Sequence, residues 1–182
     1  AIEYLAPQGI TVIEANCADI IDAASSADVV LAETPSNPGL DVVDLHALAM
    51  TCRSHGATLI VDNTTATPLG QQPLSLGADL VVASATKALS GHHDLLAGYV
   101  AGCHVDQMAA IEHERRIAGP ILGALEAWLV LRSIATVGLR FERQCQNALA
   151  LALTLRAHPA VRSVRYPGLT DDPSHEVANR QM

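Results

Sequence analysis

The sequence has 182 residues and is poor in aromatic and positively charged side chains. Aromatic residues make up 3% of it, and Lys87 is its single lysine. It has 11 Lys and Arg against 19 Asp and Glu, and the resulting net charge of −8 argues against non-specific binding to nucleic acid. Although 49% of the residues are hydrophobic, no uninterrupted apolar run is long enough to span a membrane. The composition predicts a protein that handles a small-molecule substrate, with neither nucleic acid nor membrane as a partner.

Several motifs that would assign another chemistry are absent. There is no G-x-G-x-x-G or G-x-x-x-x-G-K phosphate loop and no G-x-S-x-G nucleophile motif. His92 and His93 are adjacent on a predicted loop, where two side chains rarely converge on one ion. Ile117 stands where an H-E-x-x-H helix would place its second histidine. The sequence therefore predicts no metal site.

Paired cysteines and a secretory signal are missing as well. The four cysteines lie far apart, at Cys17, Cys52, Cys103 and Cys145. None forms a C-x-x-C pair, which predicts reduced thiols and a cytoplasmic location. The chain opens without a basic start, an apolar segment or a methionine. We expect it to be part of a longer protein.

Short apolar runs alternate with helical patterns up to about residue 104. The predicted strands cover residues 10–14, 28–33, 58–62, 80–84 and 95–101, and a helix is predicted over residues 42–55, ending at Gly56. Continuous apolar runs rich in β-branched residues, such as Leu59-Ile60-Val61, favour strands buried on both faces. Strands that alternate with helices indicate an α/β fold with a mainly parallel sheet.

The pattern becomes helical from about residue 105. Helices are predicted over residues 105–116 and 122–158, the second broken near Gly138 and ended by Pro159. A strand over residues 161–166 and a helix that starts near Ser174 follow. We expect residues 1–157 to form a large domain and residues 158–182 to begin a smaller one.

Two charged residues follow neighbouring predicted strands. Asp62 ends the strand over residues 58–62, and Lys87 follows the strand over residues 80–84 in the segment Ser84-Ala85-Thr86-Lys87. Ligands of open α/β sheets collect outside such carboxyl ends. A lysine amine can form a Schiff base with pyridoxal phosphate (PLP), an acid can keep the ring nitrogen protonated, and hydroxyls can take the phosphate.

Each of these residues also has an ordinary interpretation. Most lysines at strand ends are solvated charges, and most Asp-Asn pairs after a strand form turns. Asn37 lies in Glu33-Thr34-Pro35-Ser36-Asn37-Pro38, where two prolines are enough to explain a rigid turn. The alternative is a loop that aims the Asn37 amide into a cleft. From the pattern alone, both interpretations stay open.

Taken in order, these segments resemble the Cys/Met-metabolism PLP enzymes, which include cystathionine γ-synthase, cystathionine γ-lyase, cystathionine β-lyase and methionine γ-lyase. The resemblance rests on 33–38, Val61-Asp62-Asn63-Thr64, 84–87 and Ser90-Gly91-His92. It continues through Ala127-Trp128-Leu129, Leu139-Arg140, Glu142-Arg143 and Tyr166-Pro167-Gly168-Leu169. It therefore covers nearly the whole chain.

The resemblance implies a fold and a set of roles. The fold is the large domain of a fold-type I PLP-dependent transferase, residues 1–157, followed by the start of a small α/β domain. Lys87 is implied as the Schiff-base lysine and proton carrier, and Asp62 as the partner of the pyridine nitrogen. The other implied cofactor-binding residues are the phosphate ligands Ser84 and Thr86, Asn37 near the ring oxygen and the substrate carboxylate, and Thr64 beside the ring.

The subtype is less sharply marked. Thr65, Ala88 and His93 depart from residues common in the family, and the segment Asp-Asn-Thr-Thr-Ala-Thr-Pro with Thr-Lys-Ala-Leu is most similar to bacterial cystathionine γ-lyases. The resemblance thus implies γ-elimination of cystathionine. The alternatives are γ-replacement by a cystathionine γ-synthase, or a non-catalytic fragment. It also implies a homodimer or homotetramer, and we expect the segment alone to be inactive because parts of the family's site lie outside it.

Overall fold

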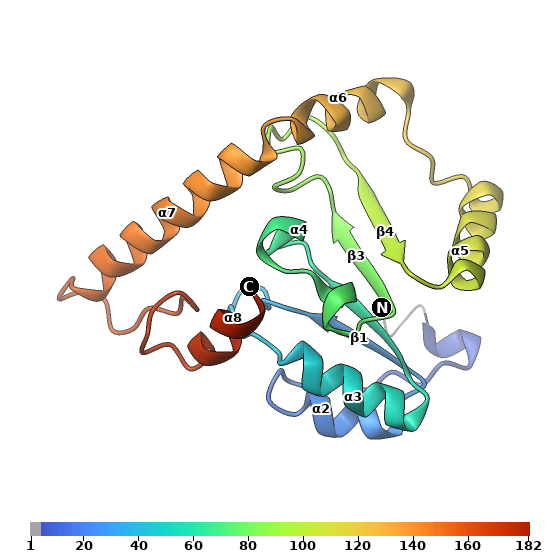
Figure 1. Cartoon of the computed structure of the whole chain (residues 1–182), viewed down its shortest axis with the longest axis horizontal. Helices are drawn as coiled ribbons and strands as arrows, with labels where there is room; N and C mark the ends of the chain where they lie inside the picture. Colours follow the sequence, from blue (N-terminus) through green and yellow to red (C-terminus); the bar gives the residue numbers. More distant parts are fainter. Residues whose placement is uncertain (1–4) are drawn as a thin grey trace.

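The computed structural model describes residues 5–182 and contains a four-stranded sheet in the order β1-β2-β3-β4 (Figure 1). The strands are β1 (Val29–Glu33), β2 (Thr58–Asp62), β3 (Leu80–Ser84) and β4 (Gly98–Gly102). The first three are parallel, and β4 is antiparallel to β3. The predicted α/β class is therefore confirmed, with an antiparallel edge added to the parallel sheet.

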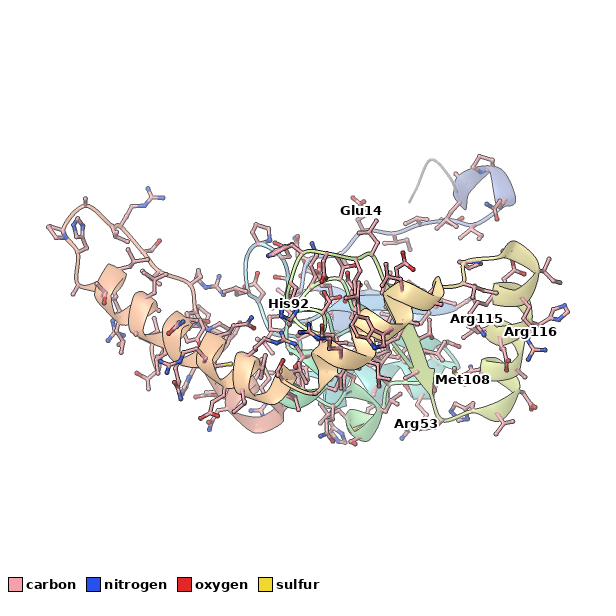
Figure 2. The ribbon with its side chains drawn as sticks, turned by 90° about the horizontal axis from the view of Figure 1, so that it is seen from above. Glu14, Arg53, His92, Met108, Arg115 and Arg116 are labelled. Atoms are coloured by element: carbon pink, nitrogen blue, oxygen red, sulfur yellow. The ribbon has the colours of Figure 1, made fainter. Side chains whose placement is uncertain are left out.

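Helices flank the sheet and extend beyond it. The longer ones are α3 (Leu45–His55), α5 (Val105–Ala118), α6 (Ala124–Ile134), α7 (Val137–Arg156) and α8 (His175–Gln181). The short ones are η1 (Ala6–Gln8), α2 (Ile20–Ala23), η2 (Ala24–Ser26), α4 (Thr67–Gly70) and η3 (Pro73–Leu76). Helix α5 lies at one end of the molecule and α7 at the other, joined through α6 (Figures 1 and 2). The predicted break in the long helix occurs at Ala135 and Thr136, just before Gly138.

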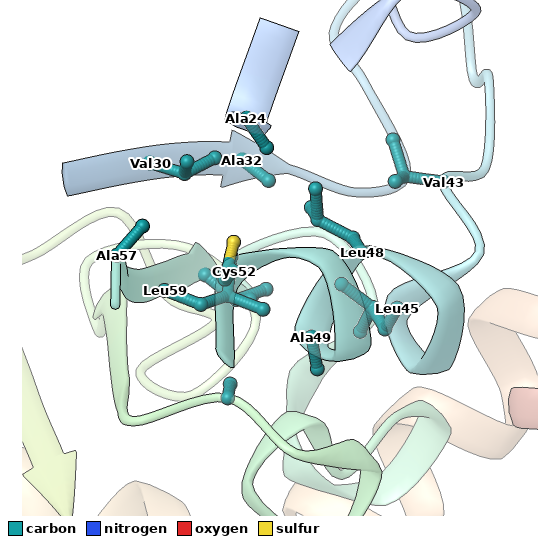
Figure 3. Packing of buried hydrophobic residues seen from close by; sticks show 12 residues of the cluster. Ala24, Val30, Ala32, Val43, Leu45, Leu48, Ala49, Cys52, Ala57 and Leu59 are labelled. Atoms are coloured by element: carbon teal, nitrogen blue, oxygen red, sulfur yellow. The ribbon is translucent and has the colours of Figure 1, made fainter. Parts of the chain in front are cut away.

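The main core lies between α3 and the first two strands (Figure 3). Helix α3 starts where the Asp44 carboxylate accepts a hydrogen bond from Ala47 N at 3.0 Å, and it ends at Gly56, whose φ of 73° suits glycine. Its buried side chains recur at helical spacing: Leu45, Leu48, Ala49 and Cys52. They pack against the strand residues Val30, Ala32, Leu59 and Val61.

Only one face of the sheet is fully covered within residues 5–182. Burial alternates along β1, where Val30 and Ala32 are buried while Val29 and Leu31 are exposed. The expectation of strands buried on both faces is therefore wrong for β1. In β2 it holds in part, because Leu59 and Val61 are buried and Ile60 between them is half-buried.

Two predicted strands do not form. Residues 10–14 and 161–166 carry strand-like alternation, but neither is assigned as a strand, and the sheet in the described part of the chain contains only β1 to β4. Alternation favours an extended backbone, whereas a strand also requires a neighbour that completes its hydrogen-bond ladder. Ile10 and Ile13 are exposed, so the first segment has no packed face either.

The segment that follows residue 157 folds back onto the loop before α3. Val42 N donates to Ser174 Oγ at 3.0 Å. The Arg165 guanidinium donates to Asp41 at 2.8 Å and to Asp172 at 3.1 Å, and so links the two carboxylates. Burial alone would raise the pKa of Asp172, but hydrogen bonds from Ser174 N, Arg165 and Tyr166 N hold it below its usual value. The carboxylate therefore stays ionised as the centre of this contact. A domain boundary at residue 157 stays a prediction.

Within residues 5–182, no helix is both long and apolar enough to cross a membrane.

Candidate active site

The ends of β2 and β3 are tied together by the turn that follows Asp62. Asp62 pairs with Val82 in the ladder, and Ser84 N donates to Thr64 Oγ1 at 2.8 Å. Thr64 N in turn donates to Asp62 Oδ1 at 2.9 Å. Thr64 thus links the carboxylate at the end of one strand to the end of the next, which explains why a small hydroxyl residue stands there. Sequence reasoning placed Thr64 at the site but did not predict this bridge.

Asp62 lines a cleft of about 1100 Å³ between the open face of the sheet and α5. Among residues 5–182, no hydrogen-bond donor reaches Asp62 Oδ2, so half of the carboxylate is available to a ligand. The pKa of Tyr99 on β4 is raised, mainly by burial and to a smaller extent by the negative charge of Asp62. The carboxylate is therefore close enough to influence other groups at this end of the sheet.

Lys87 lies on a tight turn directly after β3. Its backbone N–H donates to Ser84 O at 3.3 Å, and its carbonyl accepts from Gly91 N at 2.8 Å. The side chain is exposed, and no partner in the described part of the chain binds its amine. The fold therefore brings Lys87 to the same edge as Asp62 without an ion pair between them, which leaves the amine available for chemistry.

The two predicted phosphate ligands differ in whether the hydroxyl already has a hydrogen-bond partner. Within the described residues the hydroxyl of Ser84 makes no hydrogen bond. The hydroxyl of Thr86 donates to Ala97 O at 3.2 Å and accepts from Ala97 N at 2.9 Å. A phosphate oxygen needs a donor, so Thr86 can bind one only if its O–H turns away from Ala97.

Asn37 lies in the loop after β1, at the same edge of the sheet. The loop begins beside the site, because Thr34 N donates to Asp62 O at 3.4 Å. The Asn37 side chain is exposed, and it makes no hydrogen bond to Asp62 or Lys87 among the described residues. Its role toward a cofactor or substrate stays a prediction.

One histidine near the turn, His92, contacts polar groups of neighbouring segments. His92 Nδ1 contacts Ser90 O and lies 3.4 Å from Ser133 Oγ at the end of α6, close to the sheet edge (Figure 2). Within residues 5–182, no group of three His, Cys, Asp or Glu side chains is placed to hold a metal ion.

A chain of buried side-chain amides lies behind the site, and sequence reasoning missed it. Asn63 Oδ1 accepts from Gln71 Nε2 at 3.0 Å, and Gln71 Oε1 accepts from Gln181 Nε2 at 3.0 Å. The other amide hydrogens go to backbone carbonyls. For example, Gln71 Nε2 donates to Thr34 O, and Gln181 Nε2 donates to Val43 O. The chain connects α8 to the residue next to Asp62. No local sequence pattern marks it, because its two links join residues that are 8 and 110 positions apart.

Replacing Gln71 with leucine is expected to destabilise the full-length protein by about 3 kcal/mol, because Thr34 O, Asn63 Oδ1 and Gln181 Nε2 would each lose a buried partner. Urea unfolding measures the change. The neighbouring Gln72 is exposed, so Gln72→Leu is the matched control and should change stability little. Equal effects of the two substitutions would show that the amide chain contributes nothing.

The chain is similar in sequence to proteins of a known family. The family model described as "Cys/Met metabolism PLP-dependent enzyme" matches residues 7–182. A Streptomyces coelicolor protein, provisionally named a cystathionine gamma-lyase, is 54% identical over 89% of this chain and 41% of its own length. An L-methionine gamma-lyase from Pseudomonas putida is 44% identical over 85% of this chain and 39% of its own length.

Solved structures give the same result. A methionine gamma lyase from Micromonospora echinospora, in its apo form, superposes with a TM-score of 0.95 at 41% identity. The match covers 100% of this chain and 51% of that one. A cystathionine gamma-lyase from Lactobacillus plantarum, complexed with L-serine, has a TM-score of 0.94 at 33% identity, covering 99% of this chain and 48% of that one. This confirms the predicted fold-type I large domain.

The chain spans about two fifths of the curated relatives named here. The family model covers nearly all of it, however, and several relatives exceed 40% identity. The chain belongs to the Cys/Met metabolism PLP-dependent enzymes.

Proposed function

We propose that the full-length protein is a cystathionine γ-lyase. The reaction consumes cystathionine and water, breaks the bond between sulfur and the γ-carbon, and releases cysteine, 2-oxobutanoate and ammonia. The observation that carries the PLP chemistry is the shared sheet edge, where Asp62 has a free carboxylate oxygen and Lys87 a free amine. The choice of substrate is supported by the Streptomyces coelicolor relative, whose identity to this chain exceeds that of the other relatives named above.

The described residues fit PLP by the chemistry they offer. An anionic carboxylate suits the pyridinium nitrogen, a primary amine suits the aldehyde, and the free hydroxyl of Ser84 suits a phosphate oxygen. When bound, PLP supplies an electron sink for the negative charge that develops on the substrate carbons.

Each residue then has a defined task in the proposal. With PLP bound, Lys87 Nζ would hold it through the aldehyde and, when free, would take a proton from a substrate carbon and deliver one to the departing sulfur. Asp62 keeps the proton on the ring nitrogen. Thr64 holds the end of β3 next to the ring, because its hydroxyl accepts a hydrogen bond from Ser84 N. Asn37 supplies an amide to the substrate carboxylate, and Thr86 joins Ser84 at the phosphate after its hydroxyl rotates.

We further propose a cytoplasmic homodimer or homotetramer. Large apolar side chains on α6 and α7 remain exposed, among them Trp128 at 57% and Leu131 at 71%. Many exposed large apolar side chains on neighbouring helices favour an interface. A second copy and the rest of the chain are the surfaces available to cover it.

Product analysis tests the function. The purified full-length protein, supplied with PLP and cystathionine, should release cysteine and 2-oxobutanoate in equal amounts. Its kcat/KM for cystathionine should exceed that for methionine by about tenfold or more. Homocysteine and pyruvate as products would indicate a β-lyase, and rapid release of methanethiol from methionine would indicate a methionine γ-lyase. Cystathionine formed from an acylated homoserine and cysteine, with little cleavage, would favour the alternative of a γ-synthase.

A further inference from the structure

Arg140 on α7 reaches across to the turn that carries Lys87. Its guanidinium donates to Ala88 O at 2.6 Å and to Leu89 O at 2.9 Å. It also donates to Ser133 O at 3.0 Å and to Thr136 Oγ1 at 3.2 Å. Two acceptors thus belong to the lysine turn and two to the junction between α6 and α7. A single planar group with fixed donor directions joins the two segments.

The lysine turn needs such a partner. Residues 85–91 form a short helical turn in which Ser90 N donates to Ala85 O and Gly91 N donates to Lys87 O. The next two carbonyls, of Ala88 and Leu89, receive no backbone N–H within residues 5–182. Carbonyls at the end of a helical turn are left without partners unless another group supplies donors. Arg140 supplies donors to both.

Gly91 makes room for the guanidinium. A Cβ at residue 91 would overlap Arg140 Nη1 and lie 2.8 Å from Arg140 Cζ. The φ of 71° at this residue also favours glycine. The close approach therefore requires both residues, although they lie far apart in the sequence.

The position of the Lys87 amine depends on this turn. The Lys87 side chain is exposed and has no partner in the described part of the chain, so its backbone alone determines where the amine can reach. The neighbouring contact between His92 and Ser133 is a second tie between the turn and α6.

We propose that Arg140 is a positioning residue that fixes the turn of Lys87, so that the amine meets the cofactor aldehyde. The inference rests on the PLP dependence in the proposed function but not on the choice of substrate. Without Arg140, the turn retains Lys87 but samples other positions. Misplacement of about 1 Å can cost on the order of a hundredfold in rate.

The test measures covalent capture of PLP rather than turnover. The full-length apoprotein is mixed with PLP, portions are reduced with borohydride over time, and mass spectrometry follows the pyridoxyl group on Lys87. Hydrogen exchange of the peptide over residues 84–92 is measured on the same apoprotein. Arg140→Ala should slow capture by about tenfold or more and speed exchange in that peptide. Millimolar guanidinium ion should restore part of the capture rate.

Arg143→Ala is the matched control, because Arg143 is exposed on the same helix and binds no partner among the described residues. It should leave capture and exchange at wild-type levels. If Arg140→Ala does not fold, Arg140→Lys serves instead. Its compact ammonium cannot serve both carbonyls in the guanidinium's geometry, so slower capture is still expected.

The inference is overturned if the Arg140 variant captures PLP at the wild-type rate, or if capture slows while exchange over residues 84–92 stays unchanged. An enzyme that captures PLP normally but does not cleave cystathionine would contradict the proposed function and leave this inference standing.

Discussion

Replacing Lys87 with alanine in the full-length protein is expected to lower turnover by about 10⁴-fold or more, because the variant loses both the amine that holds the cofactor and the group that moves protons. Borohydride reduction of the wild-type enzyme with PLP should place the pyridoxyl group on Lys87, the only lysine in these 182 residues. The same treatment of Lys87→Ala should label nothing in this segment.

Lys87→Arg separates the charge from the chemistry. Arginine retains the positive charge but stays protonated and cannot act as a nucleophilic amine. We therefore expect it to be as inactive as Lys87→Ala. The folded structure should survive both changes, since the Lys87 side chain is exposed and binds no partner within residues 5–182. A labelled lysine elsewhere in the protein, or substantial turnover by either variant, would contradict the assignment of Lys87.

Replacing Asp62 with asparagine is expected to cut turnover by about 10³-fold, because the site loses the charge that stabilises the protonated ring nitrogen. The backbone should be little disturbed. Asparagine retains an oxygen that can accept the hydrogen bond from Thr64 N, so the link to Ser84 can persist.

Asp28→Asn is the matched control for this change. Asp28 is an exposed carboxylate just before β1, at the opposite end of the strands, and its removal changes the net charge by the same amount. It should leave turnover near wild type. The two variants are compared by steady-state kinetics at saturating PLP. Near-normal turnover by Asp62→Asn would show that Asp62 is only a turn residue.

The sequence predicted well those features that depend on local pattern. The strands at Thr58–Asp62 and Leu80–Ser84 have the predicted bounds, and the helix before Gly56 ends as expected. These elements are bounded by turn and cap residues whose preferences are intrinsic. The family, the cofactor and the fold class were also predicted, because ordered motifs survive over nearly the whole chain.

Features that depend on distant partners were not predicted. Residues 10–14 alternate like a strand, but no pattern in the segment itself reports whether a neighbour will pair with it. The hydrogen bonds from Arg140 to the lysine turn link it to Ala88 and Leu89, which lie 52 and 51 positions earlier in the sequence. By its helical pattern alone, Arg140 looks like an ordinary helix-surface arginine. The cofactor and substrate roles of all six site residues stay predictions: Lys87, Asp62, Ser84, Thr86, Asn37 and Thr64. The Asn37 amide has no partner in the described part of the chain, and the Thr86 hydroxyl is bound to Ala97.

The amide chain of Asn63, Gln71 and Gln181 also sets an order of events during synthesis. The carbonyl and amide groups of Thr34, Asn63 and Gln71 leave the ribosome early, yet their chain ends on a residue 110 positions after Gln71. The support behind Asp62 therefore cannot close until α8 has been made and has docked. Until α8 has been made, Gln71 Oε1 lacks the donor that Gln181 supplies, so the polar network behind the candidate site is completed only by a segment made long after the sheet.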